Sequence, residues 1–224
     1  MCGRFTINLT YEQLNEYVKT HFDIYDNIEN FDTPRYNVAP GTNIISVIND
    51  GISYRVGTIK WGFKIPINNK SVNIINVKAE NIFTSKLFKP SALSKRCLII
   101  ADSFYEWGMK KEKGSPQRIM LKSKEPFSMA GIYVKVLEDD GKPAFVVAII
   151  TTVANTLVQT IHDRMPVILS PEKEKIWLDN SIKDVSKLKS LLSAYPAEEM
   201  CMYKVSNKVN DAANDYQELI EEVC

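Results

Sequence analysis

The chain has 224 residues, of which 45% are hydrophobic and 25% charged, and its 28 basic and 27 acidic side chains leave a net charge of +1. Such values are typical of a soluble globular protein and exclude a disordered, collagen-like or coiled-coil chain. No apolar run approaches the roughly 20 residues that span a bilayer, and the N-terminus lacks the apolar segment of a signal peptide. The four cysteines have no CxxC spacing, which predicts neither a zinc site nor a disulfide scaffold: Cys2, Cys97, Cys201 and Cys224. We therefore expect a cytoplasmic protein with no membrane segment, metal or cofactor.

The first predicted elements are a short strand and an amphipathic helix. Residues Arg4–Leu9 alternate between polar and apolar side chains, as a half-buried strand does. Thr10, with Gln13 three residues later, has the pattern of a capping box, and apolar residues follow at helical spacing. A helix is therefore predicted to begin directly after Thr10.

Strand patterns dominate the rest of the chain. They cover Ile44–Ile48, Ser53–Trp61, Cys97–Ala101, Arg118–Leu121, Ser128–Val136 and Ala144–Thr151. Two further helices are predicted, one beginning at Ser170-Pro171-Glu172 and one over Asp184–Leu192. With no repeat and no linker, this pattern predicts a single α+β domain over residues 1–224, built on a mostly antiparallel, barrel-like sheet with a few peripheral helices.

Cys2 is the first residue that could carry chemistry. A small side chain after Met1 is the usual context for removal of that methionine, which would make Cys2 the N-terminus. Its amine and thiol would then have ordinary pKa values near 7.7–8.0 and 8.5, so both react near neutrality. An amine and a thiol on adjacent carbons can trap an aldehyde as a thiazolidine ring. The alternative is an inert small residue in a frayed terminus.

Two acid–base candidates lie farther along the chain. His162 stands between Ile161 and Asp163 in a loop pattern, and loops often carry catalytic groups. The simpler interpretation is a loop histidine paired with Asp163. Glu106 stands among aromatic residues in Phe104–Trp107, where partial desolvation would raise its pKa. The alternative there is a glutamate that faces outward from a strand.

A basic and aromatic segment follows the sequence Asn76-Val77-Lys78-Ala79-Glu80. It contains Phe83, Lys86, Phe88, Lys89, Lys95 and Arg96. Cations interleaved with aromatic rings suit a groove for single-stranded nucleic acid, because the cations meet phosphates and the rings stack on bases. A solvated lysine face beside a hydrophobic anchor has the same pattern.

Six short motifs occur in the order found in one known family. They are Met1-Cys2-Gly3-Arg4-Phe5, Arg35-Tyr36-Asn37-Val38-Ala39-Pro40-Gly41, Trp61-Gly62, Asn76-Val77-Lys78-Ala79-Glu80, Phe104-Tyr105-Glu106-Trp107 and His162-Asp163-Arg164-Met165-Pro166. Together they resemble the SOS-response-associated peptidase (SRAP) family, the abasic-site processing proteins, over essentially the whole chain. The resemblance implies a single α+β domain with a β-barrel-like core and a positively charged cleft.

The resemblance also implies a function and a set of site residues. Family members recognise abasic sites in single-stranded DNA, especially near junctions with duplex, and bond to them through an N-terminal cysteine. Carried over by motif, Cys2 would be the nucleophile, Asn76 would hold its amine and backbone, Glu106 would act as acid–base catalyst, and His162 would shuttle protons during ring opening and crosslink reversal. The DNA contacts would be Arg4, Asn37, Lys78 and Arg164. The family also implies self-cleavage that removes Met1, a monomer, and association with the nucleoid on DNA.

Two positions depart from the family pattern. Lys78 stands where arginine is common, and lysine lacks the planar fork that binds phosphate through two hydrogen bonds. The stretch after Trp61-Gly62 lacks the tryptophan that many relatives carry, so Ile65 or Ile67 would have to serve as an apolar wedge at the lesion.

Two other functions are compatible with the same residues. One is a cysteine peptidase that acts on other proteins with Cys2, His162 and Asn76. The other is a module that binds single-stranded DNA without covalent chemistry, in which Cys2 would be dispensable because phosphate contacts carry most of the binding energy.

Overall fold

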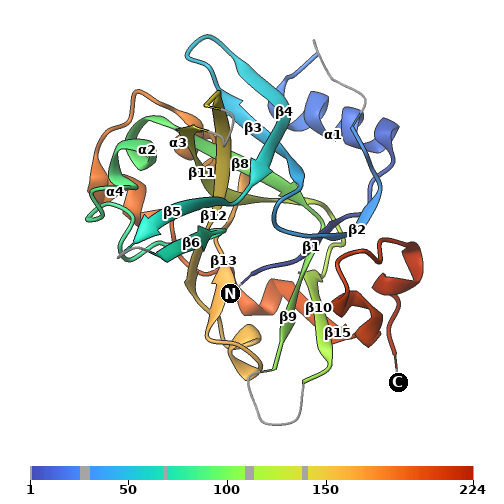
Figure 1. The fold of residues 1–224 in the computed structure, drawn as a ribbon. Helices are drawn as coiled ribbons and strands as arrows, with labels where there is room; N and C mark the ends of the chain where they lie inside the picture. The colour runs from blue at the N-terminus through green and yellow to red at the C-terminus, as the bar shows by residue number, and fades with distance from the viewer. Residues whose placement is uncertain (1, 26–30, 68–69, 109–113, 138–140, 224) are drawn as a thin grey trace.

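A closed five-stranded barrel lies at the centre of the fold (Figure 1). The computed structural model describes residues 2–25, 31–67, 70–108, 114–137 and 141–223. The barrel strands are β3 (Asn43–Asn49), β4 (Tyr54–Trp61), β8 (Arg96–Ala101), β11 (Phe127–Leu137) and β12 (Pro143–Val153). Neighbours from β4 through β3, β8 and β11 to β12 pair antiparallel, and a parallel pair between β12 and β4 closes the ring.

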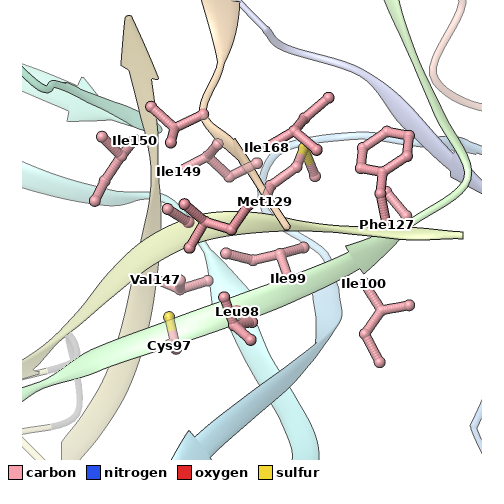
Figure 2. Close-up of a cluster of buried hydrophobic side chains, with 14 of the residues drawn as sticks. Cys97, Leu98, Ile99, Ile100, Phe127, Met129, Val147, Ile149, Ile150 and Ile168 are labelled. Atoms are coloured by element: carbon pink, nitrogen blue, oxygen red, sulfur yellow. The ribbon is translucent and has the colours of Figure 1, made fainter. Parts of the chain in front are cut away.

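The barrel interior explains the continuous apolar runs of its strands. All six residues of β8 are buried. Figure 2 shows side chains of β8 gathered with Met129 of β11, with Val147 and Ile149 of β12, and with Ile168. Strands that are covered on both faces need apolar side chains at successive positions rather than at alternate ones.

A second antiparallel sheet adjoins the barrel and carries the N-terminus. Its strands are β1 (Phe5–Ile7), β2 (Arg35–Val38), β9 (Ser103–Trp107), β10 (Pro116–Leu121) and β15 (Met200–Lys204), in the order β15-β10-β9-β1-β2. Only Asp102 separates β8 of the barrel from β9 of this sheet. The two sheets share one hydrophobic cluster, which includes Phe5, Ile119 and Leu98.

Short strands and a hairpin complete the sheets. Next to the barrel strand β12, β7 (Asn76–Lys78) pairs parallel and β13 (Arg164–Pro166) pairs antiparallel, while β14 (Ile168–Leu169) pairs with β11. The hairpin consists of β5 (Phe63–Ile67) and β6 (Lys70–Ile74). The barrel strand β12 therefore pairs both with β7, which begins with Asn76, and with β13, which begins two residues after His162.

In the part of the chain that the structure describes, four α-helices lie around the sheets: α1 (Tyr11–Phe22), α2 (Lys89–Ser94), α3 (Pro171–Leu178) and α4 (Val185–Ser190). The 3₁₀ helices are η1 (Val158–Thr160), η2 (Ala197–Glu199), η3 (Asn207–Asn210) and η4 (Gln217–Ile220). The predicted capping box is present, since Thr10 Oγ1 accepts from Gln13 N at 3.2 Å and Gln13 Oε1 accepts from Thr10 N at 2.8 Å. None of the helices in the described residues is long and apolar enough to cross a membrane.

The predicted α+β class with a barrel-like, mostly antiparallel core is confirmed. The six strand patterns from Ile44 to Thr151 all fall on observed strands. The first predicted strand, Arg4–Leu9, is shorter in the structure, where β1 covers only Phe5–Ile7. The last predicted helix, Asp184–Leu192, begins at Val185 after an Asp184 cap and ends at Ser190.

Candidate active site

Cys2 lies buried at the start of the second sheet, with none of its surface exposed. The chain that follows it is aligned by β9, because Tyr105 N donates to the Arg4 carbonyl at 3.0 Å. Asn76 Nδ2 donates to the Cys2 carbonyl at 2.8 Å. The alternative of a frayed terminus is therefore wrong for Cys2, which is anchored from both the second sheet and β7.

The Cys2 thiol is kept protonated by its surroundings. Burial raises its pKa above the ordinary value, and the negative charge of Glu106 raises it further. The thiol has only a weak contact, at 3.8 Å from the Arg4 carbonyl oxygen. Near neutrality this group is therefore a thiol rather than a thiolate, so it can give up a proton only as its sulfur forms a bond.

Glu106 points inward from β9 and is only 2% exposed. The alternative of an outward-facing glutamate is therefore wrong. Burial raises the pKa of its carboxyl to about 7. A carboxyl group with that pKa can both donate and accept a proton near neutrality, which is the property that general acid–base catalysis needs.

His162 faces Glu106 from the loop between η1 and β13. Its Nε2 lies 3.9 Å from Glu106 Oε2. Its Nδ1 accepts from Arg164 N at 3.0 Å and lies 3.1 Å from Asp163 Oδ1. Nδ1 also lies 3.3 Å from the Arg164 carbonyl oxygen, so it meets both donor and acceptor groups, while Nε2 is directed toward Glu106. Burial lowers the pKa of this imidazole, which favours the neutral ring.

The four predicted chemical residues thus come together from separate parts of the chain. Cys2 precedes β1, Asn76 begins β7, Glu106 lies on β9, and His162 precedes β13. The arrangement places a buried thiol beside a carboxyl and an imidazole whose pKa values are shifted in opposite directions. Such a pair can divide proton donation and proton acceptance between two groups.

Two of the predicted DNA contacts, Arg4 and Asn37, bind the C-terminal segment. Arg4 Nη1 donates to Asn37 Oδ1 and to the Val209 carbonyl, both at 2.7 Å. Asn37 is 1% exposed, and its Nδ2 donates to the carbonyl oxygens of Val209, Asp211 and Asn214. In this structure both side chains therefore hold residues 209–214 against β1 and β2.

The other two predicted contacts differ in their exposure. Lys78 is exposed at the end of β7, the strand that begins with Asn76. Arg164 is 8% exposed, and its guanidinium forms a bidentate ion pair with Glu80. Of the two candidate wedge residues, Ile65 is half-buried on β5, and the side chain of Ile67 lies outside the described residues.

Sequence reasoning did not find the partners of these cations. Glu80 stands in a motif that the sequence analysis singled out, but nothing in the local sequence assigns it to Arg164, which lies 84 positions away. Thr151, whose carbonyl accepts from Arg164 Nη2 at 2.7 Å, has no signal beyond its place in an apolar strand.

Comparison with known proteins gives a consistent result. Residues 1–212 match the profile of the family described as SOS response associated peptidase (SRAP). The chain is 44% identical over 227 aligned residues to the abasic site processing protein YoqW of Bacillus subtilis, covering 99% of each chain. It is 31% identical to the abasic site processing protein YedK of Escherichia coli, covering all of both chains.

Solved structures with the same fold include two bacterial proteins. A protein from Bacteroides thetaiotaomicron is similar with a TM-score of 0.81 at 23% identity, covering 100% of both chains. A phage-related protein from Bordetella bronchiseptica is similar with a TM-score of 0.71 at 26% identity, covering 91% of this chain and 94% of its own.

Proposed function

Because the chain belongs to the SOS response associated peptidase family, we propose that it processes abasic sites in single-stranded DNA by bonding to them covalently through Cys2. The observation that carries this proposal is the position of Cys2, whose buried thiol lies with Asn76, Glu106 and His162. Relatives along the full length of the chain are named abasic site processing proteins. The crosslink protects the lesion, because the trapped sugar can no longer undergo the elimination that cleaves the strand.

The proposed reaction needs Met1 to be removed, so that Cys2 carries a free α-amine. The amine adds to the aldehyde carbon of the ring-opened abasic sugar and loses water to give an imine. The Cys2 sulfur then bonds to the imine carbon while the thiol proton passes to the nitrogen, which closes a thiazolidine ring. One aldehyde and one aminothiol give one thiazolidine and one water. The high pKa of the buried thiol fits this order, in which the amine attacks first.

Glu106 and His162 are assigned the proton transfers. The sugar opens when a proton reaches its ring oxygen, and the imine forms when a proton reaches the departing hydroxyl. Glu106, with a pKa raised to about 7 by burial, can donate to these oxygens and accept from the amine. The His162 ring lies 3.9 Å from Glu106 Oε2, beyond a direct hydrogen bond, so it would exchange protons with Glu106 through the reacting group or one water between them. The same steps in reverse release the crosslink.

Asn76 is assigned to hold the nucleophile. Its hydrogen bond to the Cys2 carbonyl keeps the first residue from rotating away from Glu106. The same groups would assist the self-cleavage that removes Met1, a residue outside those the structure describes. Lys78 is the exposed cation best placed for phosphate. Arg4 and Arg164 complete the proposed DNA face, and the buried Asn37 would orient Arg4 within it. The protein would act as a monomer near junctions of single and double strand.

The test is a denaturing gel. Protein shown by mass spectrometry to lack Met1 is mixed with an oligonucleotide that bears one abasic site, beside an undamaged oligonucleotide and a Cys2→Ala variant. We expect a slow, heat-stable band that needs both the lesion and Cys2, with at most one adduct per protein. Glu106→Gln should slow adduct formation, and His162→Ala should impair formation or reversal.

The same experiment separates the two other functions. A peptidase that acts in trans would turn over many peptide molecules and form no DNA band. A non-covalent module would bind the oligonucleotide equally well with and without Cys2 and would leave no band after denaturation. Either result would contradict the covalent mechanism.

A further inference from the structure

Arg164 is held by an ion pair that takes no part in the proposed proton transfers. Its Nη1 donates to Glu80 Oε1 at 2.6 Å and its Nη2 to Glu80 Oε2 at 2.9 Å, so the carboxylate accepts two parallel hydrogen bonds from the guanidinium. The hydrogen bond from Arg164 keeps the pKa of Glu80 below its usual range. The Glu80 carboxyl is therefore ionised near neutrality.

This ion pair joins the two chain segments that border the site. Glu80 lies two residues beyond β7, whose first residue is Asn76. Arg164 begins β13, and its own backbone N–H is the group that donates to His162 Nδ1. Arg164 Nη2 also donates to the carbonyl of Thr151 on β12, which lies between the two segments. The guanidinium is thus the direct connection between the Asn76 segment and the His162 loop.

We propose that Glu80 is a positioning residue for the lesion chemistry: by holding Arg164, it fixes the loop that presents the His162 ring to Glu106. This inference rests on the proposed function. The Glu80 side chain is 46% exposed, and among the described residues it forms no hydrogen bond or ion pair with His162 or Cys2, so it acts through Arg164.

The same geometry limits what Arg164 can offer to DNA. A guanidinium has five N–H groups. Glu80 takes two and Thr151 takes one, and Nε is buried without a hydrogen-bond partner among the described residues. One N–H on Nη1 is left for a phosphate. Glu80 therefore limits a phosphate to this one N–H and offsets the positive charge of the guanidinium, so the positioning role costs DNA affinity.

These two roles of Glu80 predict effects of opposite sign for Glu80→Gln. Crosslinking at saturating abasic oligonucleotide should slow by about tenfold or more, because the His162 ring is no longer fixed. Non-covalent affinity for the same oligonucleotide, measured in a Cys2→Ala background, should be unchanged or tighter, because a negative charge near the DNA is lost. A merely structural role would weaken both. The matched control is Glu198→Gln, an exposed glutamate on η2 that should change neither.

A double-mutant cycle and a DNA-free measurement complete the test. If Glu80 acts through Arg164, Glu80→Gln should have no further effect on the rate in an Arg164→Gln background. The protein has two histidines, so a His21→Gln variant leaves His162 as the only imidazole in an NMR spectrum. We expect its ring nitrogens to show one fixed tautomer, and to show exchange between tautomers after Glu80→Gln. An unchanged rate, additive effects in the cycle, or unchanged ring signals would overturn the proposal. Since the NMR measurement needs no DNA, it decides the positioning role even if the wild-type protein forms no adduct.

Discussion

Glu106 illustrates, at the scale of one residue, the cost of building an acid–base group into a core. Burial raises its pKa from 4.5 to about 7. A carboxyl that binds its proton more tightly in the folded state than in the unfolded state makes stability fall as the pH rises between those two values. Above pH 7 the buried charge therefore costs on the order of 3 kcal/mol, and below pH 4.5 the cost vanishes.

The direction in which stability changes with pH gives a prediction that can be tested without DNA. Glu106→Gln replaces the carboxyl with a neutral group of the same shape, so its unfolding free energy should lie within about 1 kcal/mol of the wild-type value at pH 5 and exceed it by about 3 kcal/mol at pH 8. Urea unfolding at the two pH values measures the difference, and titrating groups that do not interact with Glu106 cancel in the comparison. Equal stability of the two proteins at pH 8 would mean that Glu106 is not desolvated as the structure has it.

Single residues also show which features of the site can be predicted from the local sequence and which cannot. The local surroundings of Glu106 predicted its burial, because aromatic neighbours on both sides are a sequence feature. The partners of Arg4 could not be predicted in the same way, since Val209 lies 205 positions away. A motif places a cation at a site, but only the folded chain decides whether that cation faces a phosphate, a carboxylate or a carbonyl oxygen.

At the scale of elements, closure of the barrel depends on a close approach at Gly131. This residue lies on β11 opposite Cys97 of β8 and Ile149 of β12. A Cβ atom at this position would lie 2.4 Å from Ile99 Cδ1, 3.0 Å from Cys97 Sγ and 3.2 Å from the Ala148 carbonyl oxygen. A side chain there would force the three central strands apart.

We therefore predict that Gly131→Ala destabilises the protein by about 1–3 kcal/mol, as overpacking of a core does. Ile99→Val removes the atom nearest to the new methyl group and by itself costs about 1 kcal/mol. The double variant should be more stable than the sum of the two single effects predicts, because the alanine methyl group occupies the space left by the Ile99 Cδ1 atom. Strict additivity in urea unfolding would contradict the predicted contact.

The elements that sequence patterns predicted share one property. The long strands β3, β4, β11 and β12 and the helix α1 carry their own apolar periodicity or cap, so the signal is local. The patterns missed β2, β5, β6, β7, β9, β13, β14 and β15, which have two to five residues each. Such strands are too short to show a period, and they exist because a neighbour such as β12 offers them a free edge. The site lies largely on these short strands, so its assembly could not be predicted from periodicity.

At the scale of the whole molecule, the site lies where the barrel meets the second sheet. One hydrophobic cluster contains Cys2 and Phe5 from the N-terminal segment, Ile119 from the second sheet, and Leu98 from the barrel. A cluster that is shared in this way couples the two sheets, since neither can expose its inner face without exposing the other's. We therefore propose that residues 1–224 unfold as one domain, as the sequence predicts.

Three tryptophans make this last proposal measurable, because each reports on a different region. Trp61 ends β4 of the barrel, Trp107 ends β9 of the second sheet, and Trp177 lies on α3. In each of three variants that keep one tryptophan and replace the other two with phenylalanine, the fluorescence and circular dichroism transitions in urea should coincide. Comparing two signals within one variant removes the effect of the stability lost by the substitutions. A Trp107 transition that precedes the circular dichroism change would show that the second sheet unfolds separately, and the crosslinking site would then be lost before the barrel.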